Sequence, residues 1–302
     1  MKQTTFKSFD GTTLACYIWE DVTTPKGIVQ IIHGMSEHAQ RYNDLAKFLN
    51  QYGYIVFADD HRAHGQTAGS PQMVGKYDKP TNLYLDTVRD EIEISKHLKQ
   101  TYPNLPLFVF GHSYGSLITQ KYIQDCNLHK GAILCGTSYM NTFENKMAKT
   151  VAGITKKVKG NNANAKFIEN LSFKKYGKGV PADELWITHN KEIVKEYKAD
   201  PYCGNPFSAK FYYDLMSGVI PTYKKANLKK IDKRKPLMLI SGALDAFSKN
   251  SKLVRKLYEK YRSLGIIDLT IHIYPNMRHE VHNEINNARV YADIKNFLNE
   301  HI

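Results

Sequence analysis

Apolar and polar residues alternate in blocks that divide the chain into short apolar segments and longer amphipathic segments. The short segments are rich in Val, Ile, Leu and Phe, which is typical of buried strands. They cover residues 27–33, 54–58, 107–110, 131–135, 237–241 and 269–274. Two further stretches, 5–9 and 14–19, alternate with a period of two and flank Asp10-Gly11, so they predict a hairpin.

The amphipathic segments carry apolar residues at helical spacing. They predict helices over 42–52, 82–101, 113–125 and 248–264, and a C-terminal helix from about residue 284. Residues 60–81 are predicted to form a polar loop. Because strands alternate with helices, we expect an α/β fold in which a mostly parallel central sheet is flanked by helices on both faces.

The pattern changes between residues 137 and 231, where strand signals stop and lysine becomes frequent. An amphipathic helix is predicted here, because Met140, Phe143, Met147, Val151 and Ile154 recur every three or four residues between lysines. The economical interpretation is an α/β core made of residues 1–136 and 232–302. A helical cap or lid, residues 137–231, is then inserted in this core.

The composition is that of a folded protein, with 42% hydrophobic and 24% charged residues in a chain of 302. No apolar run reaches the length of a membrane span, and the first residues lack the apolar core of a signal peptide. The four cysteines form no C-x-x-C pair, which indicates reduced thiols in a cytoplasmic protein rather than a disulfide framework.

The formal net charge of +13 bears on the choice of partners. It is compatible with a lysine-rich proteome, with transient attraction to an anionic membrane surface, or with nucleic acid. No nucleic-acid motif is visible and the aromatic residues are not interleaved with the basic ones, so we expect no nucleic-acid partner. The charge does not indicate an oligomeric state.

The strongest chemical signal is the stretch 107–116, an apolar strand followed by Gly111-His112-Ser113-Tyr114-Gly115. The two glycines allow a sharp turn and a close approach of strand and helix. Ser113 would then lie at the tip of the turn, above the N-terminus of the next helix. This G-x-S-x-G pattern is the nucleophile elbow of α/β hydrolases, but it is weak when it stands alone.

A serine nucleophile needs a base, and the base needs an orienting acid. Asp245 and His279 each follow a predicted strand, at the edge where open α/β sheets build their sites, and they come in the chain order that this fold requires. His282 is the rival base. The pair His279 and His282 is spaced i,i+3 rather than i,i+4, so it does not match a zinc motif, and we expect no catalytic metal.

The oxyanion of an acyl-transfer intermediate needs two preorganised N–H donors. The first is expected from the backbone of Tyr114, the residue after the nucleophile. The second is expected from the backbone of Met35, which follows His33-Gly34 directly after an early strand.

Several motifs together resemble one family. Residues 33–42 (HGMSEHAQRY) are similar to H-G-x-x-E-H-x-x-R-Y in monoacylglycerol lipase and lysophospholipase-like α/β hydrolases, which are serine hydrolases. Residues 59–67 resemble D-x-R-G-H-G-x-S with Ala63 and Thr67 as departures, and residues 111–116 resemble G-H-S-M-G-G with Tyr114 and Ser116 as departures. The segments around Asp245 and His279 complete the match, which runs from about residue 10 to the C-terminus.

The resemblance implies a serine carboxylic-ester hydrolase that acts through an acyl-enzyme on Ser113, with a small-molecule ester or lipid as substrate and no cofactor. A monoacylglycerol lipase or lysophospholipase-like esterase is the first hypothesis. The alternatives are a short-chain carboxylesterase, a thioesterase or a proline-type aminopeptidase on the same triad, or a hydrolase-fold protein that binds a ligand without turnover.

The cap is expected to choose the substrate. Its candidate acyl-pocket residues are Met140, Phe143, Phe207, Phe211 and Met216. The competing interpretation is that these apolar side chains pack the cap onto the core, as such stripes usually do.

Overall fold

The computed structural model describes residues 1–165, 176–181 and 184–302. Its centre is a sheet of eight strands in the order β1-β2-β4-β3-β5-β6-β7-β8, counted over these residues. The strands are β1 (Lys2–Lys7), β2 (Thr13–Trp19), β3 (Gly27–Ile32), β4 (Tyr54–Asp59), β5 (Leu107–His112), β6 (Gly131–Cys135), β7 (Leu237–Gly242) and β8 (Leu269–Tyr274). Strand β2 is antiparallel to β1 and β4, and the other neighbouring pairs are parallel. The predicted α/β fold and its hairpin are confirmed.

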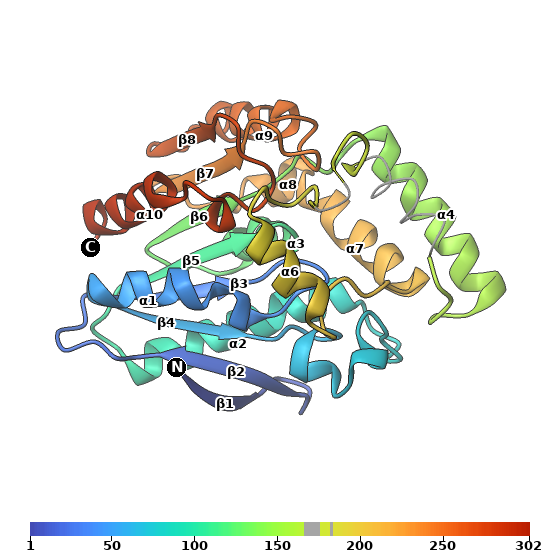
Figure 1. Cartoon of the computed structure of the whole chain (residues 1–302), viewed down its shortest axis with the longest axis horizontal. Coiled ribbons are helices and arrows are strands. Elements are labelled where there is room, and N and C mark those ends of the chain that lie inside the picture. Colours follow the sequence, from blue (N-terminus) through green and yellow to red (C-terminus); the bar gives the residue numbers. More distant parts are fainter. Residues whose placement is uncertain (166–175, 182–183) are drawn as a thin grey trace.

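Helices cover both faces of the sheet (Figure 1). Helices α1 (Asn43–Gln51) and α10 (Ala288–Glu300) bury their apolar stripes on one face, with side chains of β3, β4, β5 and β7. Helices α2 (Leu83–Thr101), α3 (Tyr114–Asp125) and α9 (Lys252–Ser263) bury theirs on the other face. The parallel strands β3 to β7 are buried along their whole length, as expected for a sheet covered on both sides.

The chain between β6 and β7 contains helices α4 (Phe143–Lys159), α6 (Lys191–Ala199), α7 (Ala209–Thr222) and α8 (Lys225–Leu228). Helix α7 packs against α2 and α3, and α4 packs along α7 at the edge of the molecule (Figure 1). The described part of residues 137–231 adds no strand to the central sheet. The division into core and cap at residues 137 and 231 stays a prediction.

The C-terminal helix begins one turn later than the sequence pattern predicts. Glu284 has an extended backbone, and α10 starts at Ala288. The Glu284 carboxylate accepts hydrogen bonds from the backbone N–H groups of His189 and Arg278, at 3.0 and 2.7 Å. These long-range bonds hold Glu284 outside the helix, and a 3-10 turn, Val281–Asn283, precedes it.

The predicted loop 60–81 is polar but largely buried at its start, and it includes two 3-10 turns, Gly65–Ala68 and Pro71–Met73. The Arg62 guanidinium is buried there and donates to the carboxylates of Asp10 and Asp90. The charge is tolerated inside because both partners are acidic and hydrogen-bonded to it. The four cysteines are free and buried. Among the described residues, no helix has the length and apolar character needed to cross a bilayer.

The close packing of α7 on α2 gives a stability prediction. A Cβ atom at Gly218 would overlap the ring of Tyr84, which is buried and donates to the Leu117 carbonyl at 2.7 Å. We expect Gly218→Ala to lower the free energy of unfolding by about 1–3 kcal/mol, as overpacked cores do. Denaturant titration measures this change.

The matched control is Gly153→Ala on α4, where the new Cβ would lie 3.1 Å from the half-buried ring of Tyr213. Because this ring has room to move, the helix propensity of alanine should stabilise the protein by up to about 1 kcal/mol. Equal stabilisation by both substitutions would contradict the described contact between α7 and α2.

Candidate active site

Ser113 lies in a tight turn between β5 and α3 and has φ 51° and ψ −116°, an uncommon conformation for a residue with a side chain. Gly115 allows this turn to sit against β3, since a Cβ there would overlap the carbonyl oxygens of Ile32 and His33. A Cβ at Gly111 would overlap the Thr119 hydroxyl in the next turn of α3. The G-x-S-x-G spacing is therefore a packing requirement of this strand–turn–helix unit.

Two side chains from distant strand ends reach Ser113. His279 follows β8, and its Nε2 lies 2.8 Å from Ser113 Oγ. Its Nδ1 lies 2.9 Å from Oδ1 of Asp245, which follows β7 and is fully buried. The Asp245 carboxylate is itself fixed by the Phe247 N–H at 2.9 Å and the Ser241 hydroxyl at 3.3 Å. The structure thus brings together the three residues that the sequence nominated.

The pKa of His279 reflects two opposed effects. Burial lowers it, but the Asp245 carboxylate and its hydrogen bond raise it by more, so the pKa lies above the usual value of 6.5. An imidazole with this environment can take a proton from Ser113 and hold it as an imidazolium facing a carboxylate.

The rival base, His282, is not part of this arrangement. It is buried behind the site, where its ring stacks on Tyr42 with the centroids 5.0 Å apart. Burial and the nearby His112 lower its pKa to about 3. Its Nδ1 lies 3.8 Å from the sulfur of Cys135. The geometry therefore places His279, the histidine that the sequence nominated, next to Ser113 and places its rival His282 elsewhere.

The proposed oxyanion donors occupy suitable places. Tyr114 is the first residue of α3, and the first N–H groups of a helix have no partner within the helix. Met35 lies in the turn after β3, beside the elbow. Within the described part of the chain, neither N–H has a hydrogen-bond acceptor. Their role as an oxyanion hole stays a prediction.

A buried carboxylate that the sequence reasoning did not assign supports this turn. Glu37 Oε1 accepts a hydrogen bond from the Gly34 N–H at 2.6 Å and from the Tyr42 hydroxyl at 2.8 Å. The same oxygen lies 3.1 Å from Nδ1 of His112, the residue before Ser113. Glu37 therefore links the turn that carries Met35 to the start of the elbow.

The charge of Glu37 is balanced by Arg41, which is also paired with Glu280 through two hydrogen bonds of 2.8 and 2.7 Å. Glu280 follows His279 directly, so the network reaches the third loop of the site. Burial raises the pKa of Glu37, but Arg41 and His112 lower it by more, and it lies well below its usual value. The sequence signal was the H-G-x-x-E-H-x-x-R-Y motif, whose Glu and Arg had received no role.

The candidate acyl-pocket residues divide into two groups. Phe207 and Phe211 are buried, with rings 4.3 Å apart, and both pack around His64. Phe211 also packs on the Tyr114 ring at 5.3 Å, so these residues join α7 to the core next to the elbow. Met140 and Met216 are buried in the same apolar cluster.

Phe143 is different, because it is the first residue of α4 and is 74% exposed. The sequence pattern predicted Phe143 in an acyl pocket, but the structure leaves most of its side chain open to solvent. The part of α4 that is buried lies further along the helix, at Ala152, and α4 packs against α7.

Two aromatic residues near His279 were missed by the sequence reasoning. The ring of Trp186 lies 4.7 Å from that of His279, and the ring of Phe247 lies 5.5 Å from it. Neither residue belongs to a recognisable motif. Trp186 lies in a segment without periodicity, and nothing in the sequence around Phe247 indicated a role beyond its place two residues after Asp245. These apolar rings can contact a substrate bound over Ser113.

Comparison with known proteins places these features in context. The family described as serine aminopeptidase, S33, matches residues 23–286. A monoglyceride lipase from Homo sapiens is 28% identical over 286 residues, which cover 91% of this chain and 82% of the relative. A monoacylglycerol lipase from Mycolicibacterium smegmatis is 26% identical over 297 residues, which cover 98% of this chain and 96% of the relative. Among solved structures, a thermostable carboxyl esterase from Bacillus coagulans in complex with glycerol has a TM-score of 0.89 and 27% identity, covering 99% and 98% of the two chains.

The Glu37 network predicts a pH-dependent loss of stability. We expect Glu37→Gln to lower the free energy of unfolding by about 3–5 kcal/mol at neutral pH, because Arg41 loses one of its buried partners. The pKa of Glu37 is depressed in the folded state, so its contribution is complete above pH 4.5 and is lost as the pH falls through the folded value. Denaturant titrations from neutral pH downward should therefore show the two proteins converging.

The control is Glu192→Gln, at an exposed position in the first turn of α6, where the expected change is below about 1 kcal/mol. A gap between wild type and Glu37→Gln that stays constant into acid would contradict an ionised Glu37.

Proposed function

Because the chain belongs to the family described as serine aminopeptidase, S33, and is an α/β hydrolase of the lipase and esterase type, we propose that it cleaves lipid esters through an acyl-enzyme on Ser113. The observation that carries the proposal is the pair of hydrogen bonds that joins Asp245, His279 and Ser113, at 2.9 and 2.8 Å.

The proposed reaction has two stages, acylation of Ser113 and hydrolysis of the acyl-enzyme. His279 Nε2 accepts the hydroxyl proton as Ser113 Oγ attacks the ester carbonyl, and Asp245 stabilises the imidazolium. The N–H groups of Met35 and Tyr114 donate to the developing oxyanion. His279 then returns the proton to the departing alcohol, which leaves the acyl group on Ser113. Water, activated by the same imidazole, releases the acid and restores the enzyme.

Monoacylglycerols are the proposed substrates. The human and mycobacterial relatives are named monoglyceride and monoacylglycerol lipase, and a similar solved esterase is in complex with glycerol. The aromatic rings of Trp186 and Phe247 beside His279 support an apolar acyl group at the reacting carbonyl. A lysophospholipid places a similar acyl ester on a charged head group, and it is the second substrate of interest. Four free, buried cysteines support a reducing compartment, and the proposed location is the cytoplasm.

Substitution of the nucleophile tests the mechanism. We expect Ser113→Ala to lower kcat for ester hydrolysis by about 10⁴- to 10⁶-fold, the loss typical of a broken triad. His279→Ala should lose a comparable factor, and His282→Ala, which removes no group at Ser113, should lose far less. Circular dichroism and melting curves establish that each variant is folded. Unchanged turnover by folded Ser113→Ala, or a greater loss from His282→Ala than from His279→Ala, would refute the assignment.

A substrate panel separates the remaining alternatives. p-Nitrophenyl esters of increasing chain length, monoacylglycerols, lysophospholipids, acyl thioesters and aminoacyl arylamides are compared by kcat/KM. The proposal predicts the highest values for monoacylglycerols and for long or medium acyl esters. A preference for acetyl esters indicates a short-chain carboxylesterase, a preference for thioesters indicates a thioesterase, and a preference for arylamides indicates an aminopeptidase.

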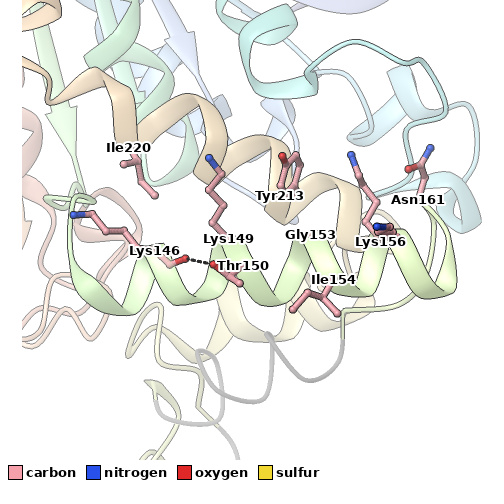
Figure 2. A pocket seen from close by; sticks show the side chains of 10 residues that line it. Lys146, Lys149, Thr150, Gly153, Ile154, Lys156, Asn161, Tyr213 and Ile220 are labelled. Atoms are coloured by element: carbon pink, nitrogen blue, oxygen red, sulfur yellow. Dashed lines mark hydrogen bonds between the residues drawn. The ribbon is translucent and has the colours of Figure 1, made fainter.

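The surface of α4 supports a proposed contact with anionic lipid. Phe143, Met147, Ile154 and Val158 are exposed along one face of this helix. Beside this face lies a groove of about 970 Å³ between α4 and α7, shown in Figure 2. The residues that line it combine basic and apolar side chains: Lys146, Lys149, Thr150, Gly153, Ile154, Lys156, Lys157, Asn161, Tyr213 and Ile220. Apolar side chains next to lysines are typical of helices that lie at a membrane surface.

Liposome sedimentation tests this contact. The protein should bind vesicles that contain phosphatidylglycerol, bind pure phosphatidylcholine weakly, and dissociate at high salt. Replacing Lys146, Lys149, Lys156 and Lys157 by Gln should weaken binding by at least about 100-fold, at about 1 kcal/mol per contact. The control replaces four exposed lysines elsewhere, Lys224, Lys225, Lys229 and Lys233. Equal losses from both sets would indicate attraction to the net charge alone.

A further inference from the structure

His38, Asp200 and Cys203 meet away from Ser113, where the loop after β3 touches the end of α6. One potential ligand atom from each, an imidazole nitrogen, a carboxylate oxygen and the thiol sulfur, lies within 4.8 Å of the other two. His38 Nε2 and Asp200 Oδ2 are 2.8 Å apart. All three residues belong to the described part of the chain, and they come from segments separated by more than half of the sequence.

The cluster opens into a cavity of about 190 Å³ that all three residues help to line. The Asp200 side chain is 31% exposed and the His38 side chain is 11% exposed, so an ion from solvent can reach the cluster. Cys203 is buried, and its thiol has no hydrogen-bond partner among the described residues. A partly exposed carboxylate therefore lies beside a buried imidazole and a buried thiol.

The local charge also favours a cation. Arg41 lines the cavity, but its charge is already paired with the buried carboxylates of Glu37 and Glu280. Glu196 and Asp200 add two further negative charges to the lining. This small acidic site stands out in a chain whose formal net charge is +13.

We propose that this cluster binds one zinc ion, held by His38 Nε2, an Asp200 oxygen and Cys203 Sγ, with water as the fourth ligand. The donor set suits Zn²⁺, which accepts N, O and S ligands at about 2.0–2.3 Å in a tetrahedron. Ligand atoms are then about 3.3–3.7 Å apart, so small side-chain rotations suffice. As zinc binds, the proton between His38 Nε2 and Asp200 is given up to water and Nδ1 carries the proton of the neutral imidazole. The thiol proton also passes to solvent, and no oxidation or reduction takes place.

The ion would strengthen a junction that hydrogen bonds already make. The Ser36 carbonyl accepts from the Gly204 N–H and from the Tyr197 hydroxyl, both at 3.0 Å, and the Ser36 hydroxyl donates to the Asn205 carbonyl at 3.0 Å. Ser36 follows Met35 directly. Zinc would therefore clamp the turn next to the elbow to the segment after α6, and it should raise the melting temperature because it binds only the folded site.

The test uses purified full-length protein stripped with a chelator and then titrated with Zn²⁺ in a calorimeter. One zinc per chain is expected, with a rise in melting temperature. Cys203→Ser should weaken binding by more than about 100-fold, because loss of a group that only hydrogen-bonds a ligand already weakens metal binding by about 10–100-fold. Cys126→Ser is the matched control, since Cys126 is 8% exposed and Cys203 is 9% exposed. With Co²⁺ as a probe, wild type should show a thiolate-to-metal charge-transfer band that Cys203→Ser lacks.

Unchanged zinc affinity in Cys203→Ser, or a cobalt spectrum without a thiolate band, would overturn the proposal. Zinc lost on Cys135→Ser instead would place the ion at the buried group of His112, Cys135 and His282, and would also overturn it. If Cys203→Ser does not fold, N-ethylmaleimide labelling of wild type decides. Zinc should protect Cys203 and leave the labelling of Cys126 unchanged, and equal labelling of Cys203 with and without zinc would refute the site.

Discussion

The interaction on which the site depends is the buried ion pair between Glu37 and Arg41. A carboxylate in the interior destabilises the fold unless it is paired and hydrogen-bonded. Glu37 meets this requirement with Arg41, the Gly34 N–H and the Tyr42 hydroxyl, and it faces His112. These partners belong to the turn after β3 and to the end of β5, and Arg41 continues to Glu280 after β8. The segments that carry Met35, Ser113 and His279 are thereby linked to one another.

Tyr114 contributes to the elbow through both its backbone and its side chain. Its N–H lies at the start of α3, where a helix offers donors and a positive dipole end. Its ring stacks on His64 with centroids 5.7 Å apart and packs on Phe211 of α7. A tyrosine is a departure from the resembled G-H-S-M-G-G motif, and the structure gives it a packing role. The elbow is thus anchored both to the sheet, through the glycines, and to the helices between β6 and β7.

The sequence predicted the centre of the sheet well because the strands β3 to β7 are buried along their whole length and read as continuous apolar runs. It also nominated Ser113, Asp245 and His279, since parallel strands deliver the residues that follow them to one edge. It could not place the start of α10, because the hydrogen bonds of Glu284 to His189 and Arg278 cross the fold. The roles of Glu37 and Arg41, the position of Trp186 and the exposure of Phe143 depend on tertiary contacts in the same way. Periodicity identifies apolar faces, but it does not say which partner covers them.

The central claim is that Ser113 is a nucleophile activated by His279, whose imidazole is oriented by Asp245. Labelling of the native protein with a fluorophosphonate, followed by peptide mass spectrometry, tests it most directly, because the reagent reacts much faster with an activated serine than with an ordinary hydroxyl. The account predicts one label per chain, on Ser113, with labelling greatly slowed by Asp245→Asn. A folded native protein that stays unlabelled, or that carries the label on another residue, would contradict the account.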